Sequence, residues 1–75
     1  MNLMEVGRGG RAKVLRVEKC DAYRRLLDLG ITPGTYITVN HIAPFGGTVL
    51  VALRGYTLAL RANAGRHIII EELLQ

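Results

Sequence analysis

Residues 26–35 have the sequence LLDLGITPGT, which predicts where a short helix ends and how the next strand begins. Gly30 follows the leucines, and glycine is the usual residue in the left-handed conformation just after a helix. Ile31 occupies the position whose side chain typically folds back over the last helical turn. Pro33 and Gly34 suit the two central positions of a type II turn. The stretch therefore predicts a capped helix, a covered helix end and a turn that starts a strand.

Residues 20–29, which run into this stretch, have a helical pattern. Ala22, Leu26 and Leu29 are spaced so that they form one apolar face of a helix. Asp21 precedes this pattern and is expected to be the N-cap, where a side-chain oxygen accepts a hydrogen bond from the first helical N–H groups. We therefore expect one short helix that begins after Asp21.

Most of the remaining chain is typical of short strands. Apolar or alternating segments are separated by glycine and proline. Gly55 and Tyr56 are expected to join the third and fourth strands tightly, and residues 62–66 to form a helical turn or a loop. Five short strands with one helix between the first two predict a mainly β fold, a small SH3-like antiparallel barrel in a single domain. The expected strands are residues 11–18, 35–43, 48–54, 57–61 and 67–73.

In two of the expected strands, the residue pattern bears on which faces are buried. Alternation along residues 35–43 places Ile37 and Val39 on one face and Ile42 on the other. The apolar run of residues 49–53 fits a bent strand that is buried on both faces, or a strand with one face against a partner or a second copy. A homo-oligomer is therefore one of the expected assemblies.

Composition limits the class of protein. The chain has 75 residues, which is near the lower limit for a domain held by a single apolar core. It has one cysteine, which excludes an internal disulfide and favours a reducing compartment. It has no apolar run of about 20 residues and no pattern of a secretory signal. We therefore expect a cytoplasmic protein.

The formal net charge is +4 and the sequence pI is about 9.8, which suits a nucleic acid, an acidic membrane surface or an acidic protein partner. The basic residues are scattered, with no run of five, and the tyrosines do not alternate with arginines as in a base-stacking surface. A solvated basic face explains the charge. We expect no nucleic-acid partner and keep nucleic-acid binding only as a third hypothesis.

The sequence offers little support for enzyme chemistry. It contains no serine, and its glycines lack the lysine of a phosphate-binding loop. Cys20, His41 and His67 are the candidate metal ligands, with Glu71 or Glu72 as a further donor, but they lack the short paired spacing of a zinc site. We therefore expect no enzyme activity, no resident cofactor and no metal site.

Two segments are candidates for contact with a partner. The loop of residues 43–48, APFGGT, contains the chain's only phenylalanine, which either anchors an interface or folds back to plug one end of the barrel. In residues 54–61, RGYTLALR, the leucines are expected to point inward and the arginines and tyrosine outward. The predicted partner-binding residues are Pro44, Phe45, Arg54 and Tyr56, with Arg24 and Arg25 as a secondary patch on the helix.

Three motifs, in this order, resemble those of a known family. They are LDLG with TPG at residues 27–30 and 32–34, APFGG at 43–47, and RGYTLALR at 54–61. Over residues 7–71 the chain resembles the FeoA family, the small cytoplasmic accessory proteins of bacterial ferrous iron uptake.

This resemblance implies a non-enzymatic adaptor that docks on the cytoplasmic part of the ferrous iron transporter FeoB, which carries a GTP-hydrolysing domain. The adaptor would alter the transporter's assembly or activity and would reach the membrane only through it. A second hypothesis is a carrier or sensor that binds Fe²⁺ itself, through Cys20 or a histidine–carboxylate site. Another alternative is a dimerising or peptide-binding module, because similar domains form the C-terminal part of some metal-dependent repressors.

Overall fold

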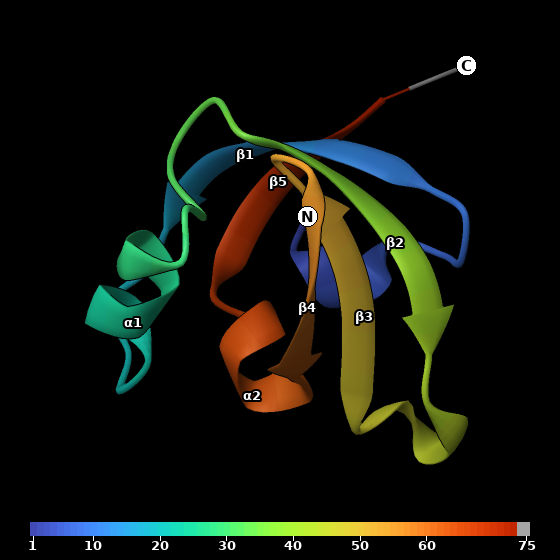
Figure 1. Cartoon of the computed structure of the whole chain (residues 1–75). Helices are drawn as coiled ribbons and strands as arrows, with labels where there is room; N and C mark the ends of the chain where they lie inside the picture. Colours follow the sequence, from blue (N-terminus) through green and yellow to red (C-terminus); the bar gives the residue numbers. More distant parts are fainter. Residues whose placement is uncertain (74–75) are drawn as a thin grey trace.

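The computed structural model describes residues 1–73 (Figure 1). The predicted set of five strands, with a helix between the first two, is confirmed. The strands are β1 (Arg11–Val17), β2 (Tyr36–Ile42), β3 (Thr48–Leu53), β4 (Tyr56–Arg61) and β5 (Ile68–Leu73). The helices are α1 (Tyr23–Asp28) and α2 (Ala62–Gly65), and the 3₁₀ turns are η1 (Leu3–Glu5) and η2 (Pro44–Gly46). In this part of the chain, no helix has the length and apolar character needed to cross a membrane.

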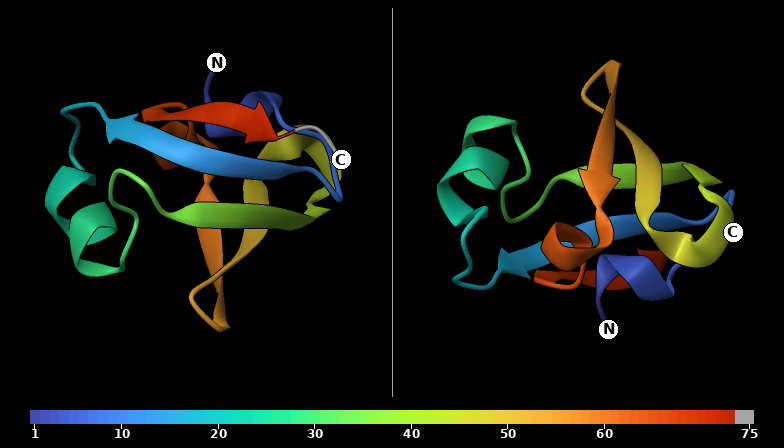
Figure 2. Two further views of the ribbon diagram at one scale, coloured as in Figure 1. Left: turned by 90° about the horizontal axis from the view of Figure 1, so that it is seen from above. Right: turned by 90° about the horizontal axis from the view of Figure 1, so that it is seen from below.

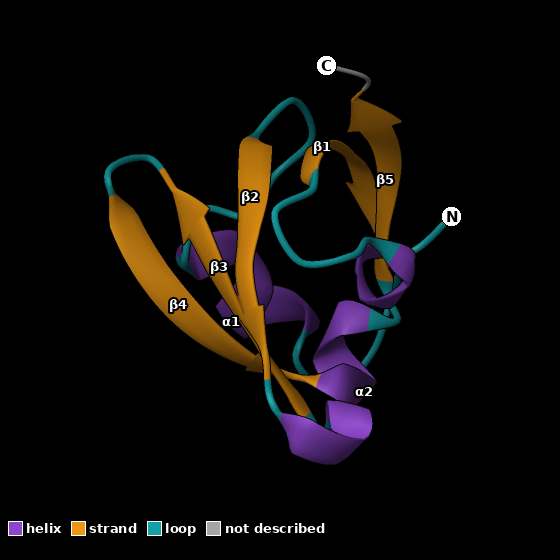
Figure 3. Cartoon of the chain, turned by 90° about the vertical axis from the view of Figure 1, so that its right-hand side faces the viewer, coloured by secondary structure: helices purple, strands orange, loops and turns teal. Residues whose placement is uncertain are grey.

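All five strands form one antiparallel sheet in the order β4-β3-β2-β1-β5. The sheet curls around the core, with β3 and β4 on one side and β1 and β5 on the other (Figure 3). The two end strands, β4 and β5, do not pair with each other, so the sheet is not closed. The short helix α2 connects them across this opening (Figure 1). The fold is the predicted SH3-like one, with an open seam between β4 and β5.

Branched aliphatic side chains fill the interior. In β3, Val49 and Val51 are buried and their neighbours are partly exposed, so this strand alternates and is not buried on both faces. Leu3 of η1 is also fully buried. The Ile70 N–H of β5 donates a hydrogen bond to the Met1 carbonyl at 2.9 Å. The N-terminal segment therefore contributes to the core and covers the outer edge of β5.

The N-terminal end of α1 differs from the prediction. Ala22 occupies the N-cap position and its side chain makes no capping hydrogen bond, so the prediction that Asp21 caps the helix is wrong. Asp21 lies within a turn instead, because the Tyr23 N–H donates a hydrogen bond to the Cys20 carbonyl at 3.0 Å. The helix therefore begins one residue later than a cap at Asp21 would place it.

The C-terminal end of α1 is as predicted. Gly30 has a φ of 97°, and its N–H donates to the Leu27 carbonyl at 3.0 Å. The Ile31 N–H donates to the Leu26 carbonyl at 3.0 Å. These two bonds form a Schellman motif, which satisfies carbonyls at the helix end. Ile31 is fully buried with Leu26, so the residue after the glycine covers the helix end.

The connection from α1 to β2 is the predicted type II turn. Gly34 has a φ of 93°, and the Thr35 N–H donates to the Thr32 carbonyl at 3.0 Å. These features are those of a turn with Pro33 and Gly34 at its centre. The turn directs the chain from the helix end into β2.

The β3–β4 hairpin turns one residue earlier than predicted. Its two turn residues are Arg54 and Gly55, with φ of 47° and 86°, and positive φ at both central residues is typical of a type I′ turn. Tyr56 pairs with Leu53 as the first residue of β4, so the predicted turn at Gly55 and Tyr56 is wrong. Arginine, a residue without the freedom of glycine, therefore occupies a left-handed position at the hairpin tip.

A register shift in β2 changes the predicted position of Ile42. The pairing with β3 is regular up to Val39 and shifts by one residue before His41, as in a β-bulge. Ile42 then pairs with Val49 and packs against the core, so the prediction that it faces away from Ile37 and Val39 is wrong. The shift leaves His41 exposed.

Candidate functional site

The turn η2 carries the most exposed large apolar side chain of the described residues. Phe45 is fully exposed and has a φ of 70°, in the left-handed region. The loop is closed by a hydrogen bond from the Ala43 N–H to the Thr48 carbonyl at 2.9 Å and by another from the Gly46 N–H to the Ala43 carbonyl at 3.0 Å. The alternative in which Phe45 plugs the barrel is therefore wrong, and the loop presents this ring to solvent.

The surroundings of η2 are basic. The Ala62 N–H donates to the Gly47 carbonyl at 3.1 Å, which joins this loop to α2 at the same end of the molecule (Figure 1). Residues 41–48 and 61–66, the segments that meet there, contain two arginines, one histidine and no acidic residue. An aromatic side chain is thus presented next to a cationic stretch of chain.

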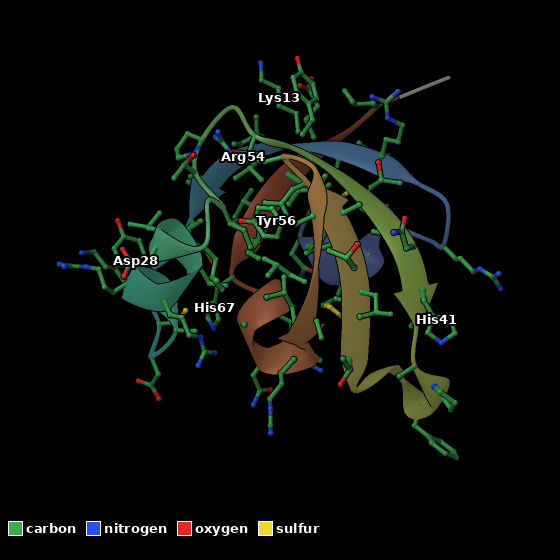
Figure 4. The ribbon with its side chains drawn as sticks, viewed as in Figure 1. Lys13, Asp28, His41, Arg54, Tyr56 and His67 are labelled. Atoms are coloured by element: carbon green, nitrogen blue, oxygen red, sulfur yellow. The ribbon has the colours of Figure 1, made fainter. Side chains whose placement is uncertain are left out.

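Arg54 and Tyr56 have partners within the chain. The Tyr56 hydroxyl donates a hydrogen bond to the Leu29 carbonyl at the end of α1. Nη2 of Arg54 donates to Oγ1 of Thr35 at 3.0 Å and lies 3.4 Å from Oγ1 of Thr32. Both side chains thus connect the hairpin tip to the helix end (Figure 4). Their predicted role in partner binding remains a prediction beside this structural one.

The secondary patch lies on a different element from the exposed phenylalanine. Arg24 and Arg25 are both exposed on α1, at the side of the molecule away from η2 (Figure 1). Arg25 lines a cleft next to the helix, whereas Arg24 does not. The structure therefore divides the predicted contact residues among η2, the hairpin tip and α1 and does not bring them into one surface.

The three metal candidates are only partly brought together. Cys20 and His67 line the same cleft, whereas His41 lies on β2 on another side of the molecule (Figure 4). Nδ1 of His67 is 3.6 Å from Oε1 of Glu18. Within residues 1–73, no group of three or more histidine, cysteine, aspartate or glutamate residues could hold a metal ion.

Sequence reasoning missed an exposed aromatic residue at the start of β2. Tyr36 is 56% exposed and lies on a shallow groove with Thr38 and Ala52, on the outer face of the sheet. A sequence signal for it existed. Tyr36 is out of phase with the buried Ile37 and Val39, so strict alternation places it on the solvent side.

The fold and these surfaces define a small SH3-like β domain that presents an exposed aromatic loop. The FeoA domain family matches residues 1–72. The chain therefore belongs to the FeoA family, a family linked to ferrous iron transport and not known for enzymes. No match was found among curated protein sequences.

Solved structures of FeoA proteins share the fold. The FeoA-like protein from Clostridium acetobutylicum is 34% identical, with a TM-score of 0.92 over 100% of this chain and 88% of its own. The FeoA protein from Chlorobium tepidum is 36% identical, with a TM-score of 0.89 over 99% of this chain and 71% of its own. The zinc-complexed FeoA of Stenotrophomonas maltophilia is 26% identical, with a TM-score of 0.84 over 95% of this chain and 89% of its own. That protein is described as an SH3 domain protein, and a role as a ferrous iron transport activating factor has been suggested for it.

Proposed function

We propose that this protein is a non-enzymatic accessory factor of bacterial ferrous iron uptake that acts in the cytoplasm. It docks on the cytoplasmic, GTPase-bearing part of the transporter FeoB and modulates the assembly or activity of the transporter. Membership of the FeoA family supports the link to ferrous iron transport. The activating role suggested for the Stenotrophomonas maltophilia protein supports modulation of a transporter.

The observation that carries the docking proposal is the conformation of Phe45. A left-handed backbone costs a residue with a side chain about 1–2 kcal/mol, and Phe45 has this backbone at a φ of 70°. Its ring is fully exposed and gains no burial within the chain. Burying a phenylalanine side chain contributes about 1.5–3 kcal/mol. The isolated chain does not gain this free energy, and an apolar pocket on a partner would supply it. Strain of this kind is concentrated at functional sites.

The surroundings of Phe45 indicate the chemistry of the partner surface. Pro44 precedes the ring and fixes its own backbone φ, which restricts the loop. Arg66 and His41 lie on the two segments that meet at this end, which have no acidic residue. The complementary surface is an apolar pocket rimmed by carboxylates, because opposite charges at the rim of an interface speed association and fix orientation.

The test is the affinity of the full chain for full-length FeoB in nanodiscs, measured by calorimetry for the wild type and for Phe45→Ala. Truncation of an anchoring aromatic residue costs about 2 kcal/mol or more, so we expect the dissociation constant to rise about thirtyfold. The variant is expected to fold normally, because the ring is fully exposed and buries no surface against the described part of the chain. A proton–nitrogen correlation spectrum checks this.

Tyr36→Ala is the matched control for this experiment. It also truncates an exposed aromatic residue, but at the opposite end of β2 from η2. We expect it to leave the affinity unchanged. If Phe45→Ala binds as tightly as the wild type, the η2 loop is not the docking surface. If the wild type itself does not bind, the docking proposal as a whole is wrong.

A further inference from the structure

A cleft of about 240 Å³ lies near the open seam of the sheet, between α1 on one side and the junction of β4, α2 and β5 on the other. Two distant parts of the chain line it, the segment that leads into α1 and the segment around α2. Its polar lining consists of Cys20, Asp21, Arg25, Arg61, Asn63 and His67.

Two arginines that line this cleft have no carboxylate partner among the described residues. Within residues 1–73, the one ion pair joins His67 to Glu18, and neither Arg25 nor Arg61 takes part in one. Asp21 also lines the cleft, but it is beyond ion-pair distance of both arginines. The cleft therefore carries a net positive charge and guanidinium donors that are available to a ligand.

One further side chain, Asn63, adds a hydrogen-bond donor to the cleft, and His67 adds an imidazole ring. The side-chain oxygen of Asn63 accepts a hydrogen bond from Nη1 of Arg66 at 3.0 Å, which leaves its NH₂ group available. Nδ1 of His67 faces Glu18, so Nε2 is the ring nitrogen without a partner among the described residues. The cleft thus combines positive charge with an amide donor and an imidazole.

The volume limits the size of the ligand. Pockets for drug-sized molecules have roughly 300–1,000 Å³, and this cleft is smaller, at about 240 Å³. A compact group fits it better than a nucleotide or a drug-sized molecule. Arginine forks bind phosphate and carboxylate through two parallel, charge-assisted hydrogen bonds.

We propose that this cleft is a binding site for a compact oxyanion, the phosphate or carboxylate group of a small molecule. Arg25 and Arg61 hold the anion from opposite sides of the cleft, and the Asn63 amide donates to it. The site does not depend on docking through Phe45, because η2 does not line the cleft.

The test is a titration of the full chain with sodium phosphate at constant pH and ionic strength, followed by backbone amide chemical shifts. We expect saturable shifts confined to residues around the cleft. Arg25→Gln and Arg61→Gln should each weaken phosphate binding about tenfold or more, because each removes a charged hydrogen-bonding group. Arg24→Gln is the matched control, since it makes the same charge change on the neighbouring residue outside the cleft and should keep wild-type affinity.

Two outcomes would overturn the proposal. One is a set of chemical-shift changes that does not saturate with phosphate. The other is an equal weakening of phosphate binding by Arg24→Gln and Arg25→Gln, which would mean that phosphate binds the basic surface in general and not this cleft. A parallel titration with acetate and citrate identifies the source of the oxyanion. Tighter phosphate binding supports a phosphate ligand, and tighter citrate binding supports a carboxylate ligand in the same cleft.

Discussion

At Gly30, both the backbone conformation and the available space disfavour a side chain. Its φ is 97°, and a Cβ added there would lie 3.1 Å from the Tyr56 hydroxyl oxygen and 3.3 Å from Cδ of Arg54. Gly34 has a similar φ of 93°, but a Cβ there would meet nothing within 4 Å. Comparing the two positions therefore distinguishes two free-energy costs of an added side chain. The cost of a left-handed backbone applies at both glycines, and the cost of displacing the hairpin tip applies only at Gly30.

We expect Gly30→Ala to destabilise the protein more than Gly34→Ala does. Gly34→Ala adds only backbone strain, about 1–2 kcal/mol. Gly30→Ala adds the same strain and also displaces the Tyr56 hydroxyl, whose hydrogen bond is worth about 0.5–1.5 kcal/mol more. Urea denaturation of both variants measures the difference. Equal costs for the two variants would show that the contact with the hairpin tip contributes nothing to stability.

At the scale of elements, the β3–β4 hairpin and α1 are connected through side chains of the hairpin tip. Tyr56 binds the Leu29 carbonyl, and Arg54 binds Thr35 in the turn that follows the helix. The helix α1 is six residues long, and helices this short are not stable alone. The connection from the hairpin therefore helps to fix the position of α1 on the molecule.

We expect Tyr56→Phe to loosen α1. Loss of the hydroxyl should lower stability by about 0.5–1.5 kcal/mol and speed amide exchange in the helix more than in β1 and β5. In the Tyr56→Phe background the cost of Gly30→Ala should also fall towards that of Gly34→Ala, because residues in contact do not act additively. Tyr36→Phe is the control, since within residues 1–73 the Tyr36 hydroxyl makes no hydrogen bond. Unchanged exchange in α1 would contradict a role for the Tyr56 hydrogen bond.

Local signals explain which elements could be predicted from the sequence. The end of α1 and the turn after it were predicted correctly, because their hydrogen bonds join residues at most five positions apart and the glycines with positive φ are visible in the sequence. The β2 bulge was not predicted, because it depends on pairing with β3. The wrong prediction for the face of Ile42 has the same cause, because a register shift of one residue moves a side chain to the other face of the strand.

The candidate sites were less predictable than the fold. The sequence allowed Phe45 either to anchor an interface or to plug the barrel, and the backbone conformation of η2 decided between them. Arg25 and Arg61 line one cleft because the fold places α1 next to the segment around α2. No spacing rule in the sequence links two arginines on such distant elements.

At the scale of the whole molecule, the open seam needs other elements to cover the core. The turn η1 packs against α2 and β5 (Figure 2). A Cβ added at Gly65 of α2 would lie 2.5 Å from the Met4 sulfur, so the two elements meet without spare space. Asn2 caps η1 through its side chain and pairs with Ile69 at the edge of β5. The N-terminal segment thus supplies the cover that a sixth strand or a closed barrel would otherwise provide.

This arrangement predicts that the third residue of the sequence is central to stability. Leu3 is 0% exposed, and truncation of such a buried leucine typically costs about 2–5 kcal/mol. A domain of this size has a total stability on the order of 5–10 kcal/mol, so Leu3→Ala should remove a large fraction of it. Leu15→Ala makes the same truncation at a position that is 45% exposed on β1, and it should cost less than about 1 kcal/mol.

Urea denaturation of Leu3→Ala and Leu15→Ala distinguishes a structural N-terminal segment from a loosely attached one. If η1 covers the seam, the midpoint falls strongly for Leu3→Ala and only slightly for Leu15→Ala, with similar denaturant slopes. If η1 detaches easily in solution, Leu3 is already solvated in the folded protein and the two variants have similar midpoints. The second result would mean that the sheet holds its core without the segment, because only a contact present in the folded state can be lost by truncation.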